Sequence, residues 1–397
     1  MWSPLIINPK EKQRTGPGRK AIPVYGKEGN TLKKNILIVL GGQSGEHEVS
    51  LMSALSVLKA LDEKKYGIIP VGISKEGTWK FFDQPLESIR EKSWQQLRDY
   101  LAKEETQDLS LRTNTGKEPK GQLVLWNQHR KEAVDLVFPV LHGPLGEDGT
   151  IQGLCEMLNV PYVGSGVLAS SVAMDKVMTK KIVSTLGISQ ADYYLVLKEE
   201  YGKSSKEMEK HQRLIETRFS YPLFIKPANL GSSVGITKAH NLSELKEGID
   251  LALTYDRKVL VEEFIDAREI ECGILGNYEP KASLPSEIIP HNEFYDYRDK
   301  YFDGKSQFVI PANLTEEQTE KIQSQGKRIF KAVGCTGLAR IDFFVEKTTG
   351  EIYFNEINTM PGFTKISMYP KMWEATGISY EALVEELIEL GLRRFQK

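Results

Sequence analysis

Two short segments near the C-terminus carry side chains whose types and spacing suit chemistry on a phosphate. Arg340 and Asp342 lie in an alternating apolar stretch that predicts a β-strand, and Glu356 and Asn358 follow within residues 355–362. Alternate residues of a strand share a face, so two antiparallel strands can bring two carboxylates and an amide oxygen to one point. These hard oxygen ligands favour Mg²⁺ bridging phosphates over Zn²⁺. The alternative is a pair of solvated strands.

A glycine- and serine-rich segment, residues 229–235, follows an apolar stretch at 222–226 that ends in Lys226. Glycines allow a backbone to approach a ligand closely, and successive N–H groups form an anion-binding nest. Ser232 and Ser233 add hydroxyl donors, and Lys226 adds a point charge that suits a phosphate. A plain hairpin turn has the same composition, so the segment alone leaves both interpretations open.

Other nucleotide motifs are incomplete. The Gly-Lys-Ser tripeptides at 202–204 and 304–306 lack the glycine that a P-loop needs five residues earlier. Residues 164–169 match the dinucleotide fingerprint, but no acidic residue follows at 181–184, where the ribose partner belongs. The sequence contains no HExxH, CxxC or GxSxG motif, which excludes zincin, zinc-ribbon and α/β-hydrolase classes.

Two polar clusters follow apolar runs that predict buried strands. Glu46 comes soon after Gly41 and Gly42, and His142 directly follows the run 135–141. Ligands often bind where parallel strands end and their loops begin, so both clusters are candidates for the wall of a cleft. The alternative for His142 is a structural histidine whose ring is satisfied by the protein.

The elements needed to position these groups alternate between short apolar strands and amphipathic helices. This alternation favours a parallel sheet with helical crossovers, at least in the first part of the chain. Residues 103–133 are polar and turn-rich and predict a long surface excursion. Strands are expected at 35–40, 68–73, 135–141, 193–197, 222–225, 270–275, 339–346 and 352–355, with helices at 169–186 and around Leu383, Leu387 and Leu390.

Length and composition restrict the class of protein. The 397 residues correspond to two or three domains, and the net charge of −2 argues against a dedicated nucleic-acid or anionic-membrane binder. The apolar runs are far shorter than the ~18 residues of a membrane span. The three cysteines are widely spaced, which predicts small buried apolar residues and a reducing, cytoplasmic compartment rather than a disulfide framework.

Residues 1–34 differ from the rest of the chain. They hold eight Lys and Arg against two Glu, and four prolines interrupt any periodicity. We expect a basic, flexible N-terminal extension, with electrostatic tethering to an anionic partner as the alternative.

Together these motifs resemble the ATP-grasp superfamily, and closely the family of D-alanine–D-alanine ligases. The resemblance runs in family order from about residue 35 to the end of the chain. It implies an α/β, three-domain ATP-grasp fold with an N-terminal parallel-sheet domain. The implied domains are an N-terminal substrate domain at 35–164, a central ATP-grasp domain at 165–265 and a C-terminal ATP-grasp domain with a metal site at 266–397. The matching stretches are 40–51, 141–153, 174–176, 225–235, 259–269, 294–301, 337–342 and 355–362.

The resemblance also implies roles for individual residues in binding ATP and two Mg²⁺ or Mn²⁺ ions. The nucleotide set is Lys176 and Lys226 at the phosphates, Ser232 and Ser233 in the closing loop, Glu262, Glu263 and Ile265 at the adenine, and Glu269 at the ribose. The metal set is Asp342, Glu356 and Asn358.

For the substrates, the family chemistry implies that the carboxylate of one D-alanine attacks the γ-phosphorus of ATP. The amine of the second then attacks the resulting acyl phosphate, for peptidoglycan precursor synthesis. The implied set is Glu46 at the first ammonium, His142 beside the first substrate, Ser232 and Tyr301 in a network with Glu46, Arg340 and the Gly362 N–H at the oxyanion, and Lys300 and Ser367 at the second carboxylate.

Two alternatives differ in the second nucleophile or in catalysis itself. A D-alanine–D-lactate ligase, or another ATP-grasp carboxylate–amine ligase, would share most of the motifs, but Tyr301 favours an amine as the nucleophile. A nucleotide-binding regulatory protein would lack a metal ligand or Arg340, and all of these are present. The family further suggests a homodimer.

Overall fold

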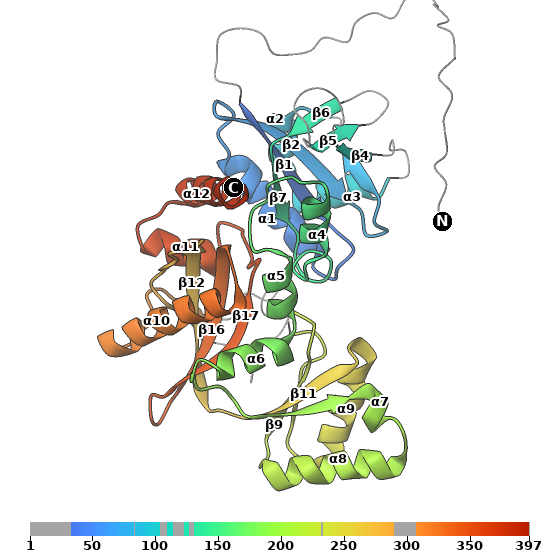
Figure 1. Cartoon of the computed structure of the whole chain (residues 1–397), viewed down its shortest axis with the longest axis vertical. Helices are drawn as coiled ribbons and strands as arrows, with labels where there is room; N and C mark the ends of the chain where they lie inside the picture. The colour runs from blue at the N-terminus through green and yellow to red at the C-terminus, as the bar shows by residue number, and fades with distance from the viewer. Residues whose placement is uncertain are drawn as a thin grey trace, which may run out of the picture. The chain divides into compact units, whose positions relative to one another are not determined.

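The computed structural model describes residues 33–82, 84–103, 109–113, 123–126, 131–231, 233–289 and 307–396. The predicted extension over 1–34 therefore lies, up to residue 32, outside the described residues. Strand β1 forms the centre of the first sheet, in the order β3-β2-β1-β7, and pairs in parallel with both neighbours (Figure 1). The strands of this sheet are β1 (Lys34–Gly41), β2 (Tyr66–Ile73), β3 (Trp79–Phe81) and β7 (Leu136–Val140).

Strand β1 carries apolar side chains on both faces of the sheet, so both faces must be buried in a core. Ile36 and Ile38 pack into one core with the first helix, whereas Leu37 and Val39 pack into a second core on the other face. Gly41 ends the strand with a φ of 89°, and a Cβ there would lie 2.2 Å from the Ile73 oxygen. The helices of this region are α1 (His47–Ala60), α2 (Leu86–Arg90), α3 (Trp94–Leu101) and α4 (Thr150–Met157).

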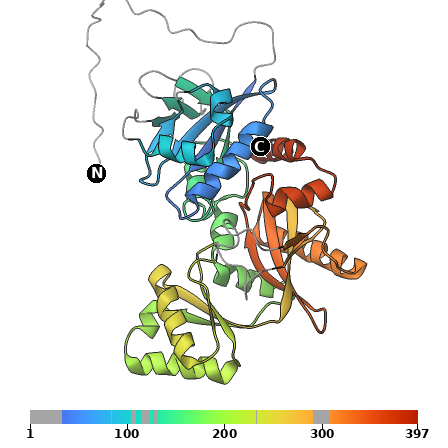
Figure 2. The same ribbon diagram turned by 180° about the vertical axis from the view of Figure 1, so that it is seen from behind.

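The last helix of the chain, α12 (Tyr380–Phe395), packs against this first sheet. Leu383, Leu387 and Leu390, which the sequence predicts on one helix face, are buried in the same core as Ile36 and Ile38. In Figures 1 and 2 the red helix α12 lies beside the blue region, so the two ends of the described chain are in contact. The first core therefore depends on residues from both ends of the sequence.

The stretch 103–133 differs from the predicted surface excursion. Its described parts, with the residues that follow, form a three-stranded antiparallel sheet in the order β4-β5-β6. Leu123 and Leu125 on the middle strand are buried in the core that also holds Leu37. The prediction differed because the polar composition of 103–133 outweighed the short alternating strand β5, which packs on this core. The strands are β4 (Ser110–Thr113), β5 (Leu123–Trp126) and β6 (Lys131–Val134).

The single helix predicted over 169–186 is two helices, α5 (Val167–Met174) and α6 (Lys176–Ser184). The break lies at Asp175, whose extended backbone ends α5 and whose carboxylate caps α6 by accepting the N–H groups of Val177 and Met178. The apolar faces of both helices pack into the core of the C-terminal sheet. The break places Lys176 at the first position of α6.

The central sheet is antiparallel, in the order β10-β9-β11-β8, and helices α8 and α9 cover one face of it (Figure 1). Its elements are β8 (Tyr193–Leu197), α7 (Lys198–Tyr201), α8 (Ser205–Arg218), β9 (Leu223–Pro227), β10 (Thr237–Ala239), α9 (Leu242–Tyr255) and β11 (Lys258–Glu263).

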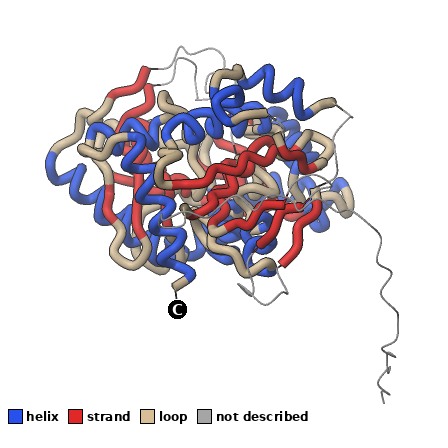
Figure 3. The backbone as a smooth tube through the Cα atoms, turned by 90° about the horizontal axis from the view of Figure 1, so that it is seen from above, coloured by secondary structure: helices blue, strands red, loops and turns tan. Residues whose placement is uncertain are grey.

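Over the described residues, the C-terminal sheet has six strands, in the order β15-β14-β12-β16-β17 with β13 beside β12. The long helix α10 covers it, and Figure 3 shows helices in blue around the red strands. All three cysteines are buried and unbridged, as the sequence predicts. The elements are β12 (Ala267–Gly276), β13 (Lys281–Ala282), β14 (Ser286–Ile289), β15 (Gln307–Val309), α10 (Glu316–Val333), β16 (Gly337–Glu346), β17 (Ile352–Asn358) and α11 (Met368–Ala375). The expected domain boundaries at 164/165 and 265/266 stay a prediction.

Candidate active site

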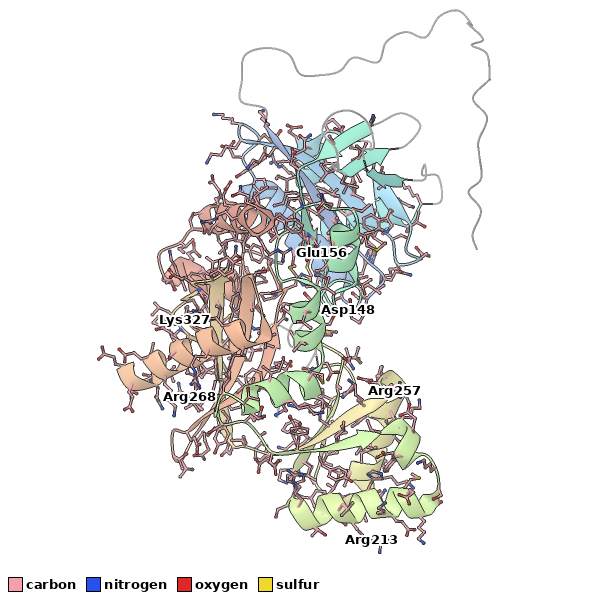
Figure 4. The ribbon with its side chains drawn as sticks, in the orientation of Figure 1. Asp148, Glu156, Arg213, Arg257, Arg268 and Lys327 are labelled. Carbon is pink, nitrogen blue, oxygen red and sulfur yellow. The ribbon has the colours of Figure 1, made fainter. Side chains whose placement is uncertain are left out.

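A cavity of about 510 Å³ opens between the central sheet and the C-terminal sheet. Strands β9 and β11 supply one wall, and β12, β16 and β17 supply the other. Arg268, labelled in Figure 4, forms part of the lining and donates two hydrogen bonds to Glu287, at 2.7 and 2.6 Å. Of the predicted site residues, the cavity brings together Lys226, Ser233, Glu262, Glu263, Ile265, Glu269, Arg340, Asp342 and Glu356.

The two carboxylates predicted from the strand pattern face each other across β16 and β17. Asp342 pairs in register with Glu356, and Arg340 pairs with Asn358. The register then shifts, because Phe343 pairs with Phe354 and leaves Asn355 as the extra residue of a β-bulge. Bulges redirect side chains and are frequent beside active sites. Here Asn355 and Glu356 both line the cavity.

These oxygens fit a divalent cation that bridges phosphates. Two carboxylates at paired strand positions are a hard donor set, and Asn358 lies on the face of Glu356 with an amide oxygen. The Asn358 Oδ1 accepts the N–H of Met360 at 2.9 Å, which fixes the orientation of the amide. Within the described residues, no group of three or more His, Cys, Asp and Glu side chains forms a metal cluster.

Arg340 binds Asp342 through a two-pronged contact. Its Nε donates to Asp342 Oδ1 at 2.8 Å and its Nη2 donates to Oδ2 at 2.7 Å. The Nε also lies 3.0 Å from Glu271 Oε1. Burial alone lowers the pKa of Arg340, but the carboxylates of Asp342 and Glu271 outweigh it and hold the pKa above its ordinary value. The guanidinium therefore stays charged and fixed at the edge of the cavity.

Lys226 and Glu262 form a buried ion pair on the opposite wall. The Lys226 Nζ lies 2.6 Å from Glu262 Oε2, and the Nζ of Lys180 lies 2.8 Å from Glu262 Oε1. Burial raises the pKa of Glu262, but Lys180 and Lys226 outweigh this effect and lower it to about 2. Glu262, predicted at the adenine, is thus a carboxylate held between two ammonium groups. Glu263, which is also predicted at the adenine, accepts the N–H of Asp192 at 2.8 Å.

Lys176 connects three parts of the site from the start of α6. Its Nζ donates to the Leu230 carbonyl at 2.6 Å and lies 3.6 Å from Glu356 Oε2. Its backbone N–H donates to the Ala228 carbonyl at 3.0 Å. The Lys226 Nζ lies 3.5 Å from Asn355 Oδ1, so the two lysines predicted at the phosphates approach neighbouring residues of β17.

The glycine-rich segment begins at a fixed point and ends in left-handed backbone. The backbone and side-chain N–H groups of Asn229 donate to Asp256 Oδ2 at 2.7 and 2.8 Å. Ser233 and Gly235 have φ values of 59° and 72°. A Cβ on Gly231 would lie 3.6 Å from Glu46 Oε2, so the Glu46 carboxylate lies close to this segment. The predicted residues Ser232, Lys300 and Tyr301 lie outside the described residues.

The described substrate residues lie in loops that follow strands of the first sheet and of the C-terminal sheet. Glu46 Oε2 would be 2.7 Å from a Cβ on Gly143, and the φ of 71° at Gly143 favours a glycine beside it. His142 has partners at both ring nitrogens: Nε2 lies 3.0 Å from Ser53 Oγ, and Nδ1 lies 2.9 Å from the Met360 carbonyl. The loop that follows Met360 contains both Gly362 and Ser367.

Gly362 and Ser367 are neighbours in that loop. A Cβ on Gly362 would lie 3.1 Å from Ser367 Oγ. The Ser367 hydroxyl lies 2.8 Å from Thr364 Oγ1 and accepts the Thr364 N–H at 3.1 Å. The loop is anchored on helix α1, because the Phe363 N–H donates to Ser53 Oγ at 3.3 Å.

Three residues of this region escaped the sequence analysis. Lys180 and Glu271 supply buried charges, and Asn355 is the bulge residue. Signals for two of them were present. Lys180 lies four residues after Lys176, on the same face of a helix, and Glu271 lies two residues after Glu269 in a strand. No sequence pattern marks the bulge.

None of the helices within the described ranges is long and apolar enough to cross a membrane.

Comparisons with known proteins agree over nearly the whole chain. The family models described as D-ala D-ala ligase N-terminus and D-ala D-ala ligase C-terminus match residues 35–165 and 182–389. A D-alanine–D-alanine ligase of Acetivibrio thermocellus is 50% identical over 371 residues, covering 91% of this chain and 97% of the relative. That of Clostridium acetobutylicum is 50% identical over 363 residues, covering 91% and 99%.

Solved structures agree with these sequence relatives. The D-alanine–D-alanine ligase of Coxiella burnetii superposes with a TM-score of 0.78 at 38% identity, over 92% of this chain and 95% of that one. The VanG D-Ala:D-Ser ligase of Enterococcus faecalis has a TM-score of 0.78 at 37% identity, over 91% and 100%. The fold is the ATP-grasp fold that the sequence predicts, and the chain belongs to the D-alanine–D-alanine ligase family.

Proposed function

We propose that this chain joins two D-alanines to D-alanyl-D-alanine at the expense of ATP, through an acyl phosphate, with the cavity residues in the roles given below. Family membership supports the ATP-dependent ligase activity and its place in peptidoglycan precursor synthesis. The single observation that carries the assignment of the site is the meeting of Lys226, Arg340, Asp342 and Glu356 in one cavity.

In the first step, a carboxylate oxygen of D-alanine attacks the γ-phosphorus, and the bond from that phosphorus to the bridging oxygen of ADP breaks. Two anions must meet, so positive charge and positioning carry most of the catalysis. We assign part of this positive charge to Lys176 of α6 and Lys226 of β9. Two Mg²⁺ or Mn²⁺ ions held by Asp342, Glu356 and Asn358 would supply further neutralisation of the phosphates.

In the second step, the free amine of the second D-alanine attacks the acyl carbonyl. The tetrahedral oxyanion requires donors already in position. Arg340, fixed by Asp342 and Glu271, and the Gly362 N–H are the proposed donors. The carbon–oxygen bond to phosphate then breaks, inorganic phosphate leaves, and the amine proton passes to solvent.

The remaining substrate roles rest on the loops around the cavity. Glu46, packed on Gly143, would bind the first ammonium, and Ser367 beside Gly362 would bind the second carboxylate. His142 is proposed beside the first substrate. Because both of its ring nitrogens have protein partners, its contribution is to hold the Met360 loop against the first sheet. Ser232, Ser233, Lys300 and Tyr301 would close the site. A homodimer in the cytoplasm is part of the same proposal.

D-serine and D-lactate are alternative candidates for the second substrate. VanG, a structural neighbour at 37% identity, is a D-Ala:D-Ser ligase, and D-lactate ligases form the other alternative. The test is phosphate release with ATP and Mg²⁺ in the presence of D-alanine, L-alanine, D-alanine with D-serine, D-alanine with D-lactate, or no substrate, followed by mass analysis. We expect phosphate release only when D-alanine is present. D-alanyl-D-alanine should be the main product of every mixture that contains D-alanine. A predominant D-serine or D-lactate product would reassign the second substrate.

A further inference from the structure

Three buried charged side chains meet at the wall of the nucleotide cavity. Lys180 of α6 and Lys226 of β9 approach different oxygens of Glu262 on β11, at 2.8 and 2.6 Å. Lys180 and Glu262 are each 3% exposed and Lys226 is 9% exposed. Figure 1 shows α6 where the central and C-terminal sheets meet. From this position Lys180 of α6 contacts Glu262 of the central sheet.

The cluster holds two positive charges and one negative charge. A single buried lysine–glutamate pair would be neutral, and burying a second ammonium group is costly unless an anion offsets it. Glu356 and Glu269 also act on the charge of Lys226 from the cavity side, and the second ammonium group suits a site where a further anion arrives. Phosphates of a nucleotide in the adjacent cavity are such an anion, because Lys226 and Glu262 both line the cavity.

The two lysines differ in whether they reach the cavity. Lys180 also donates to the Ala191 carbonyl at 3.2 Å and lies 5.5 Å from the ring centre of Tyr193, and it is not among the residues that line the cavity. Lys226 has a comparable set of contacts, 3.5 Å to Asn355 Oδ1 and 5.8 Å to the ring centre of Phe224, but it lines the cavity. Lys226 is thus the cation that can turn toward a ligand in the cavity, whereas Lys180 lies behind the cavity wall.

We propose that Lys180 is a positioning residue for nucleotide binding: it keeps Glu262 paired when Lys226 turns from that carboxylate to the phosphates of ATP. Without Lys180, the departure of Lys226 leaves a buried carboxylate without a counter-ion, which is strongly unfavourable. The inference rests on the proposed function only in taking ATP as the ligand of this cavity.

The experiment measures ATP and Mg²⁺ binding by calorimetry, with steady-state kinetics beside it, for wild type, Lys180→Met, Lys180→Arg and the control Lys181→Met. Lys181 is the next residue of α6 and is exposed. We expect Lys180→Met to weaken ATP binding about tenfold or more and to leave the KM for D-alanine within twofold. Lys180→Arg and Lys181→Met should stay within threefold of wild type.

A double variant separates this role from a merely structural one. In a Glu262→Gln background no carboxylate needs a counter-ion, so adding Lys180→Met should change ATP affinity less than twofold. A structural role for Lys180 predicts the same loss in both backgrounds, and that result would overturn the proposal. If Lys180→Met alone fails to fold, the comparison of Glu262→Gln with the double variant still decides, because an affinity drop there contradicts the proposal.

Failure of the proposed function gives a different result. It would appear as no ATP binding by wild type, or as ATP binding with no D-alanine-dependent turnover. Tight ATP binding by wild type that Lys180→Met leaves unchanged would reject the role of Lys180 alone.

Discussion

Asp342 on β16 lies directly opposite Glu356 on β17, one residue before a β-bulge shifts the register of the two strands. The pairing brings two carboxylates to one edge of the cavity, and Arg340 holds one of them through two hydrogen bonds. Lys176 approaches the other at 3.6 Å. Each carboxylate therefore has a cation beside it, and a group that binds between them must compete with those cations.

Glu356→Gln removes one charge from this pair with almost no change in shape. We expect D-alanine-dependent phosphate release to fall by about 10²-fold or more, because preorganised charge at a reacting phosphate is worth this much. Phosphate release under saturating substrates measures the effect. The control is Glu374→Gln, an exposed glutamate at the end of α11, which should keep wild-type turnover. Near-normal turnover in Glu356→Gln would remove this carboxylate from the site.

Arg340→Lys keeps a positive charge but cannot form the two-pronged contact with Asp342. We expect kcat to fall about 10²-fold while the KM for ATP changes less than threefold, because the guanidinium is proposed to act on the oxyanion of the second step. Steady-state kinetics with each substrate varied separates the two constants. A rise in the KM for ATP with unchanged kcat would instead place Arg340 at the nucleotide.

The pKa of Glu262 makes stability depend on pH in a defined window. Burial opposes its ionisation, but Lys180 and Lys226 lower its pKa from 4.5 to about 2 in the folded chain. A depressed carboxyl pKa stabilises the fold fully above the unfolded value, and this contribution, on the order of 3 kcal/mol, is lost as pH falls from about 4.5 toward 2.

Urea unfolding of wild type and Glu262→Gln at several pH values isolates that contribution. The difference in the free energy of unfolding should be constant between pH 7 and 5 and should shrink below pH 4.5. A difference that stays constant down to pH 3 would show that the lysines do not control the ionisation of Glu262.

Local patterns in the sequence predict the strands and the paired carboxylates well. The runs at 35–40 and 193–197 form strands because they are rich in apolar residues, several of them β-branched or aromatic. Asp342 and Glu356 meet because strand alternation and antiparallel pairing are both regular. The helical period of 3.6 residues places Leu383, Leu387 and Leu390 on the buried face of α12.

Local sequence patterns do not predict which elements pack against each other over long sequence distances. Nothing in residues 380–395 indicates that α12 packs on the first sheet of the chain, because its apolar face would suit any core. The break at Asp175 depends on a capping carboxylate that also pairs with Lys258, far along the chain. The sequence places Lys180 on the helix face of Lys176, but its burial follows from a carboxylate on another element.

The contact of α12 with the first sheet predicts a stability effect far from the site. Leu387→Ala removes a side chain that is 0% exposed, so we expect a loss of about 3 kcal/mol in the free energy of unfolding. Leu168→Ala on α5 is the matched control, because Leu168 is 74% exposed and its truncation should cost less than about 0.5 kcal/mol. Urea unfolding measures both, and equal losses would contradict the packing of α12 described above.

The central claim is that the carboxylate of D-alanine attacks the γ-phosphorus of ATP and is itself attacked by an amine. D-Alanine labelled with ¹⁸O in both carboxylate oxygens, incubated with ATP, Mg²⁺ and the protein, tests this directly. The proposed route transfers one labelled oxygen to each inorganic phosphate and leaves one in the new peptide bond, as mass analysis of both products would measure. Unlabelled phosphate released with the dipeptide would mean that the substrate carboxylate never bonds to phosphorus, and the acyl-phosphate route would be wrong.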